Sequence, residues 1–229
     1  MHIEHMRIGP LISLLSSTYG VPEATTVLIA RTLREAGFLT TGARGVNAPE
    51  MTLRDVARLT LALLTGEAPG KLVDEFVFMS ALQTKEIYPA EAFVSSNVLT
   101  SDHTLEEAIT AIFASMSDPQ RFDQVSIRGR IRSMPPHVSI AVDSSRRAAQ
   151  IGMSNFSADY TDLRGHARVD ELYATTPMTL EAFNEIQAIE DGSVTSFDSS
   201  SPLPGRGMRV IRSITEREIN TVCAAIRHH

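Results

Sequence analysis

The sequence predicts an α+β fold in which a helical N-terminal part precedes a mixed part with an antiparallel sheet. Two observations lead to this prediction. Up to residue 65 the apolar residues recur at helical spacing, whereas from residue 125 onward several segments alternate apolar and polar residues, as half-buried strands do. The turn-forming stretch GEAPG lies between the two patterns. We therefore expect two domains, residues 1–69 and residues 70–229.

Three helices are expected in the first domain. The first spans residues 8–17, and the second runs from Pro22 to Ala36. Gly37 follows the second helix and can adopt the left-handed conformation that ends helices. The third begins after Thr52, a good N-cap with an acidic residue three positions later. The stretch TTGARGVNAP between the second and third helices is suited to a hairpin tip or wing.

The second domain combines further helices with strands. Apolar spacing predicts helices over 71–85, 104–116 and 179–189, and a closing helix from Thr215. Period-two alternation predicts four strands, in the segments VSIRGRIRS, HVSIAVD, AAQIGMSNF and MRVIRSI. The first two of these strands flank a Pro-Pro turn, so we expect them to pair as a β-hairpin. Residues 87–102 fit neither pattern.

Composition and charge exclude several classes of protein. The net charge of −6 argues against a protein that simply coats nucleic acid, and no apolar run has the length of a membrane-spanning helix. The single cysteine, Cys223, fits a reducing compartment, and the N-terminus lacks a secretory cleavage pattern. We therefore expect a cytoplasmic protein with no membrane partner, and Cys223 is expected to be a core residue.

Motifs that carry catalysis or bind metals are missing from the sequence. It contains no Gly-x-Ser-x-Gly elbow, no phosphate-binding loop and no His-Glu-x-x-His pair. The histidines are close together only at the two termini, a spacing that does not support a metal site. We therefore expect neither an enzyme nor a bound metal or cofactor.

The segment from about Leu14 to Leu39 resembles the helix-turn-helix of bacterial winged-helix regulators. The matching features are Gly20-Val21 at the turn, Thr25 early in the second helix, and the phrase LREAGFL before the wing. The resemblance covers this segment alone. It implies that the second helix enters the major groove of double-stranded DNA and that the wing touches the duplex beside it.

A DNA-binding transcriptional regulator of bacterial or phage type is therefore the predicted function. A single copy offers few cations, so we expect a homo-oligomer, such as a dimer assembled by the second domain, to double the contacts. Polar side chains of the second helix and the wing are the expected DNA contacts: Thr25, Thr26, Arg31, Arg34, Arg44 and Asn47.

One feature of the second helix departs from the family. Val27, Leu28 and Ile29 stand where winged-helix regulators usually carry polar or basic residues. Three successive helical residues span about 300° of arc, so they cannot all face one small core. The alternative hypothesis is a protein–protein assembly module, such as a phage-type structural or DNA-packaging component. In that case these three residues form an interface and no DNA is read directly.

A row of arginines in the second domain is a further candidate contact. Arg128, Arg130 and Arg132 share one face of a predicted strand, at steps of about 6–7 Å. Three like charges in a row repel one another, so an anionic partner would stabilise them. That partner could be nucleic acid, another subunit or a small anion, and the face could equally be solvated and balanced by carboxylates of this acidic half.

Overall fold

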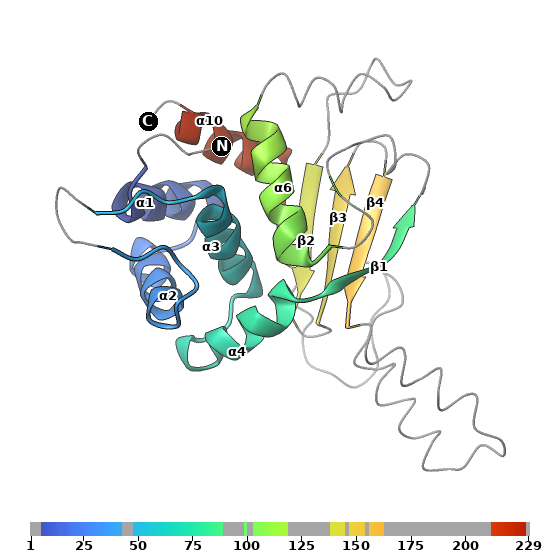
Figure 1. Ribbon diagram of the computed structural model, residues 1–229, viewed down its shortest axis with the longest axis horizontal. Helices are drawn as coiled ribbons and strands as arrows, with labels where there is room; N and C mark the ends of the chain where they lie inside the picture. The colour runs from blue at the N-terminus through green and yellow to red at the C-terminus, as the bar shows by residue number, and fades with distance from the viewer. Residues whose placement is uncertain are drawn as a thin grey trace, which may run out of the picture.

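Helices gather on one side of the molecule and an antiparallel sheet on the other, with one helix between them (Figure 1). The computed structural model describes residues 6–42, 48–88, 99, 103–118, 138–144, 147–153, 156–162 and 212–227. The predicted α+β class is confirmed. Its elements are α1 (Ile8–Tyr19), α2 (Glu23–Glu35), α3 (Leu53–Thr65), α4 (Pro69–Ser80), β1 (Gln83–Tyr88), α6 (Leu105–Ser117), β2 (Val138–Asp143), β3 (Ala148–Met153), β4 (Phe156–Thr161), β5 (Arg212–Thr215) and α10 (Glu216–Arg227).

The five strands form one sheet in the order β1-β4-β3-β2-β5, and every neighbouring pair is antiparallel. Its register aligns one apolar residue from each strand in a row, so the strands are held by matching side chains on one face. That row runs across the sheet through Ile214, Ile140, Ile151, Ala158 and Ile87. The first four of these are buried and the last is partly buried.

Three of the predicted strands are found, but their pairing differs from the prediction. HVSIAVD and AAQIGMSNF contain β2 and β3, and MRVIRSI overlaps β5. The hairpin expected between residues 125–133 and β2 is wrong for β2, because β3 and β5 occupy both of its edges. Alternation identifies a half-buried strand but not its neighbour. The segments 125–133 and 179–189 lie outside the described residues.

The predicted helices are found, with one correction. The helix expected over 71–85 ends at Ser80, and β1 begins three residues later and pairs with β4. Long-range pairing therefore determines the structure of a segment whose local pattern favours a helix. Thr52 and Thr104 close capping boxes with Asp55 and Glu107. Thr215 donates to Glu218 in the same manner at the start of α10.

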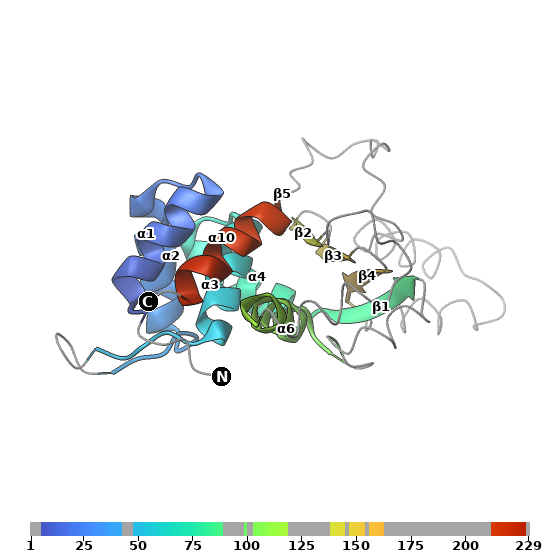
Figure 2. The ribbon, with the colours of Figure 1, turned by 90° about the horizontal axis from the view of Figure 1, so that it is seen from above.

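A single cluster of buried apolar residues runs through both halves of the chain. It includes Leu11 and Leu15 of α1, Leu59 of α3, and Cys223 and Ile226 of α10. Cys223 is thus a core residue, as predicted. Helix α10 packs against α1 and α6, so the end of the described chain completes the N-terminal helical part (Figure 2). The domain boundary at residue 69 stays a prediction, with apolar packing continuous across it.

The C-terminal end of α3 is bonded directly to the sheet. The Thr65 carbonyl accepts hydrogen bonds from Ser144 Oγ and from Arg212 Nη1, both at 3.0 Å. Gly66 follows with φ +63°, and the Arg212 guanidinium lies where a side chain at Gly66 would stand. These contacts fix α3 against β5 and against the turn that follows β2.

No helix within the described ranges combines the length and the apolar content needed to cross a lipid bilayer.

Candidate nucleic-acid interface

A short turn joins α1 to α2. Helix α1 ends at Gly20, whose φ of +66° is the left-handed conformation that glycine adopts readily, and the Val21 N–H donates to the Ser16 carbonyl at 3.1 Å. Pro22 then precedes α2, and its carbonyl accepts the first bonds of the new helix from Thr25 and Thr26. Two packed helices joined by a tight turn are present, while a DNA-binding winged domain stays a prediction.

Helix α2 ends in a left-handed turn at Gly37, the residue predicted to stop it. Gly37 has φ +80°, its N–H donates to the Arg34 carbonyl at 3.0 Å, and the Phe38 N–H donates to the Leu33 carbonyl at 2.9 Å. This pair of bonds is the Schellman arrangement, which satisfies carbonyls that the helix itself leaves free. The chain therefore leaves α2 along a defined path.

Only one stripe of α2 is buried. Thr26, Ile29, Ala30 and Leu33 are spaced three and four residues apart and face the other helices. Thr26 is 0% exposed and Ile29 is 4% exposed, so two sequence predictions are wrong. Thr26 cannot contact DNA through its side chain, and Ile29 belongs to the core rather than to an interface. Their place in the helical repeat, which residue type alone does not reveal, decides both outcomes.

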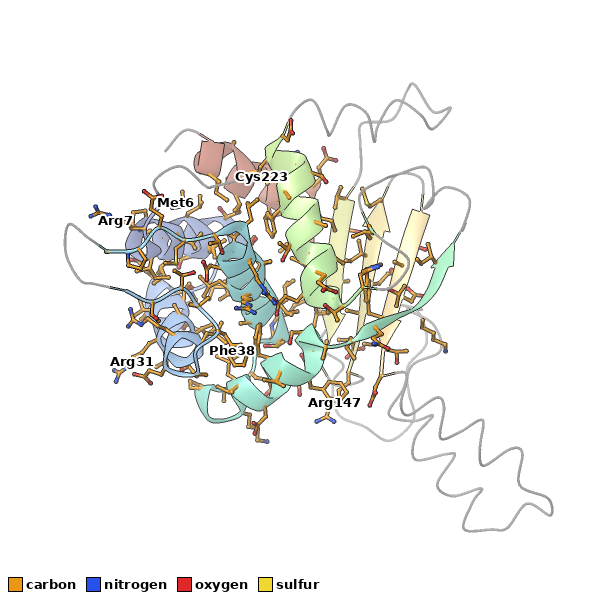
Figure 3. All side chains as sticks on the ribbon, in the orientation of Figure 1. Met6, Arg7, Arg31, Phe38, Arg147 and Cys223 are labelled. Atoms are coloured by element: carbon orange, nitrogen blue, oxygen red, sulfur yellow. The ribbon has the colours of Figure 1, made fainter. Side chains whose placement is uncertain are left out.

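The rest of α2 faces solvent. Thr25, Arg31 and Arg34 are exposed, and so are Val27 and Leu28, at 47% and 45%. Figure 3 shows Arg31 pointing away from the body of the molecule. The predicted contact residues of α2, apart from Thr26, thus share its exposed surface with the two predicted apolar interface residues.

The charges on this surface differ in their availability. Arg31 Nε lies 2.7 Å from Glu35 Oε1, and this hydrogen bond raises the pKa of Arg31 and offsets its charge. Arg34 makes no ion pair within the described part of the chain. Arg34 is therefore the α2 cation best able to meet a phosphate.

Five predicted contacts cannot be placed on this surface. Arg44, Asn47, Arg128, Arg130 and Arg132 lie outside the described residues, and their roles stay predictions.

A buried carboxylate ties together the two ends of the loop that follows α2. Asp55, in the first turn of α3, is 2% exposed and accepts hydrogen bonds from Thr40 and from Thr52. The two arms of the loop also meet at Gly42 and Pro49, where a Cβ at Gly42 would lie 3.2 Å from the proline ring. The capping pattern predicts the Thr52 bonds, but nothing in the sequence predicts the Thr40 bonds.

Two further arginines near α2 are engaged inside the fold. Arg54 Nε and Arg58 Nε lie 2.5 Å and 3.0 Å from the same oxygen, Oε1 of Glu106 on α6, whose side chain is 10% exposed. Arg58 also donates to the Phe38 carbonyl, just beyond α2. These contacts connect α3 to α6 and to the exit from α2, so Arg58 serves the fold rather than a ligand.

A second polar group lies between α6 and the sheet. His103 Nε2 lies 2.7 Å from the Tyr160 hydroxyl and 3.3 Å from Thr84 Oγ1, and burial raises the pKa of Tyr160. The group joins β1, β4 and the start of α6. Among the residues that the structure describes, no set of three or more His, Cys, Asp or Glu side chains is arranged to hold a metal ion.

Known proteins provide no independent guide to this surface. No protein-family model, curated protein or solved structure compared with the chain matches it. The function must therefore be argued from the geometry of the described residues.

Proposed function

We propose that this chain binds double-stranded DNA through the exposed surface of α2 and acts as a transcriptional regulator of bacterial or phage type. One observation carries the proposal. Helix α2 is the second of two helices joined by a tight turn, only one stripe of it is buried, and Thr25, Arg31 and Arg34 lie on its exposed surface. A helix presented in this way has the shape needed to enter a major groove.

The charges on α2 require more than one copy of the chain on the DNA. Specific sites are held by several phosphate contacts, and α2 offers one unpaired arginine and one paired arginine. Two copies related by a two-fold axis would present two α2 helices to successive turns of the major groove. The proposal therefore includes a homo-oligomer, acting in the cytoplasm where its DNA lies.

The test is a titration of the full chain on random double-stranded DNA at increasing salt. Arg34→Ala is expected to weaken binding across all sequences and to reduce the slope of log affinity against log salt by about 0.9, the loss of one phosphate contact. Arg217→Ala is the matched control, because Arg217 is an exposed arginine on α10. No binding by the unaltered chain, or an equal loss in both variants, would overturn the proposal.

A second candidate function, protein–protein assembly, is favoured by the exposure of Val27 and Leu28. Large apolar side chains on a helix surface are a common feature of interfaces. Val77 on α4 is 46% exposed and gives a matched control. If α2 is an assembly surface, Val27→Lys breaks up oligomers measured by light scattering, while Val77→Lys does not. If α2 binds DNA, Val27→Lys leaves the oligomer intact and its added cation does not weaken DNA binding.

A further inference from the structure

The Asp55 carboxylate is more extensively hydrogen-bonded than a helix cap requires. Oδ1 accepts the Thr40 N–H at 2.8 Å. Oδ2 accepts the Thr52 N–H at 2.7 Å, the Thr52 hydroxyl at 2.7 Å and the Thr40 hydroxyl at 2.8 Å. Each oxygen therefore holds a backbone N–H from a different end of the loop between α2 and α3.

The capping box of α6 shows what an ordinary cap looks like in this protein. Glu107 accepts the N–H and the hydroxyl of its own N-cap, Thr104, and lies exposed at the surface. Asp55 makes the same pair of bonds to Thr52 but is buried and also binds Thr40, fifteen residues earlier in the chain. The bonds to Thr40 are thus additional to capping.

The segment that leaves α2 is also held one turn further along α3. Arg58 Nη1 donates to the Phe38 carbonyl at 2.5 Å, and the Phe38 ring packs edge-on against Phe76 of α4, with the ring centroids 5.0 Å apart. Asp55 and Arg58, three residues apart, lie on one face of α3. Residues 38–40 are therefore bonded to α3 immediately after the left-handed turn that ends α2.

We infer that Asp55 is a positioning residue for α2: its buried carboxylate fixes the exit of α2 to the start of α3 and so sets the direction in which the exposed face of α2 points. The consequence for DNA binding rests on the proposed function, but the positioning role itself does not. A side-chain amide has one acceptor oxygen where a carboxylate has two. Asp55→Asn therefore leaves one of the two backbone N–H groups without its acceptor.

The positioning role is tested in the full chain by measuring a distance between two helices. Spin labels are placed at Ala24→Cys on α2 and Asp74→Cys on α4, both exposed, while the buried Cys223 is inaccessible to the label. Asp55→Asn is expected to broaden or shift the distance distribution at temperatures well below unfolding. Glu107→Gln, which weakens only a cap, is expected to leave it unchanged.

A milder variant covers the case in which Asp55→Asn fails to fold. Thr40→Val keeps the carboxylate and both backbone N–H donors but removes the Thr40 hydroxyl bond, and it is expected to cause a smaller broadening. Its control is Thr221→Val on α10, where the hydroxyl bonds only to the carbonyl of Arg217 one turn earlier. An unchanged distribution in Thr40→Val, or equal broadening in the control, would overturn the inference.

DNA binding by the same variants separates the two proposals. Asp55→Asn is expected to weaken binding by roughly tenfold, because binding would then have to re-order α2, while Glu107→Gln has no effect. If the distance distribution broadens but the unaltered chain does not bind DNA, the positioning role stands and the DNA proposal fails. If the distribution stays sharp in every variant, the positioning role is wrong whatever the DNA result.

Discussion

Helices α2 and α3 have the same length, 13 residues, but very different surroundings. Four residues of α2 are buried, against eleven of α3. Figure 2 shows α3 between α2 and α6, and α3 also packs against α4, β2 and β5. Both helices contain consecutive apolar residues. Those of α3 are covered on several sides, whereas Val27 and Leu28 of α2 remain exposed because their helix is packed along one stripe.

The difference indicates a division of roles. Helix α3 holds the fold together, since it bonds to the sheet through the Thr65 carbonyl, to α6 through Arg58, and to the exit of α2 through Asp55. Helix α2 contributes little to the core beyond its buried stripe, and its exposed surface is free for a partner. Changes in α3 should therefore affect stability, and changes on the outer face of α2 should affect binding.

The largest expected difference is between two leucines. Leu59→Ala on α3 removes a fully buried side chain, and we expect it to lower the free energy of unfolding by about 2–5 kcal/mol. Leu28→Ala on α2 removes a half-exposed one, with an expected change within about 0.5 kcal/mol. Urea unfolding of both variants measures the difference. Similar losses in the two would mean that α2 is covered in solution.

Two glycines with similar backbone angles give the next comparison. Gly20 before α2 and Gly66 after α3 have φ near +65°, and nothing lies within 4 Å of a Cβ at Gly20. Gly20→Ala is expected to lower the free energy of unfolding by about 1–2 kcal/mol, the cost of a left-handed alanine. Gly66→Ala should cost about 1 kcal/mol more, because Arg212 must move and lose its bond to Thr65. Thermal and urea unfolding together test this order, which equal losses would contradict.

Alkaline pH tests the contact between α1 and α3. The Tyr19 hydroxyl lies 3.1 Å from Thr60 Oγ1, and burial raises the pKa of Tyr19 above the usual tyrosine range near 10. Because the folded pKa is the higher one, the stabilisation is complete below about pH 10 and is lost as the pH rises toward the folded pKa. Tyr19→Phe is expected to reduce the slope of stability against pH there by about 1.4 kcal/mol per pH unit. An unchanged slope, measured by urea unfolding between pH 9 and 11, would show that Tyr19 ionises freely in the folded protein.

The smallest expected effect on stability comes from the exposed pair on α2. Glu35→Gln is expected to leave the unfolding midpoint unchanged, because both partners of the Arg31–Glu35 pair lie in solvent. If α2 binds DNA, the same variant should bind more tightly, since it frees Arg31 and removes a repelling charge. Glu23→Gln makes the same change of charge on α2 without touching Arg31. Tighter binding by Glu23→Gln alone would contradict the assigned role of Arg31.

Local patterns are sufficient to predict many of the elements. The left-handed stop at Gly37 and the caps at Thr52, Thr104 and Thr215 follow from interactions between residues close in sequence, and alternation locates β2 and β3. The candidate site is predicted less well. Thr25, Arg31 and Arg34 are exposed as expected, but Thr26 and Ile29 are buried, because the phase of the buried stripe depends on where the neighbouring helices lie.

The sequence by itself determined the fold class, most helices and the position of the turn between α1 and α2, since these depend on propensities and hydrogen bonds within a few residues. Tertiary structure alone decided the strand order, the conversion of residues 83–88 to an edge strand and the core shared by both halves. It also decided that Asp55 binds Thr40. Such contacts join residues far apart in the chain, and their energy depends on packing geometry that no local pattern encodes.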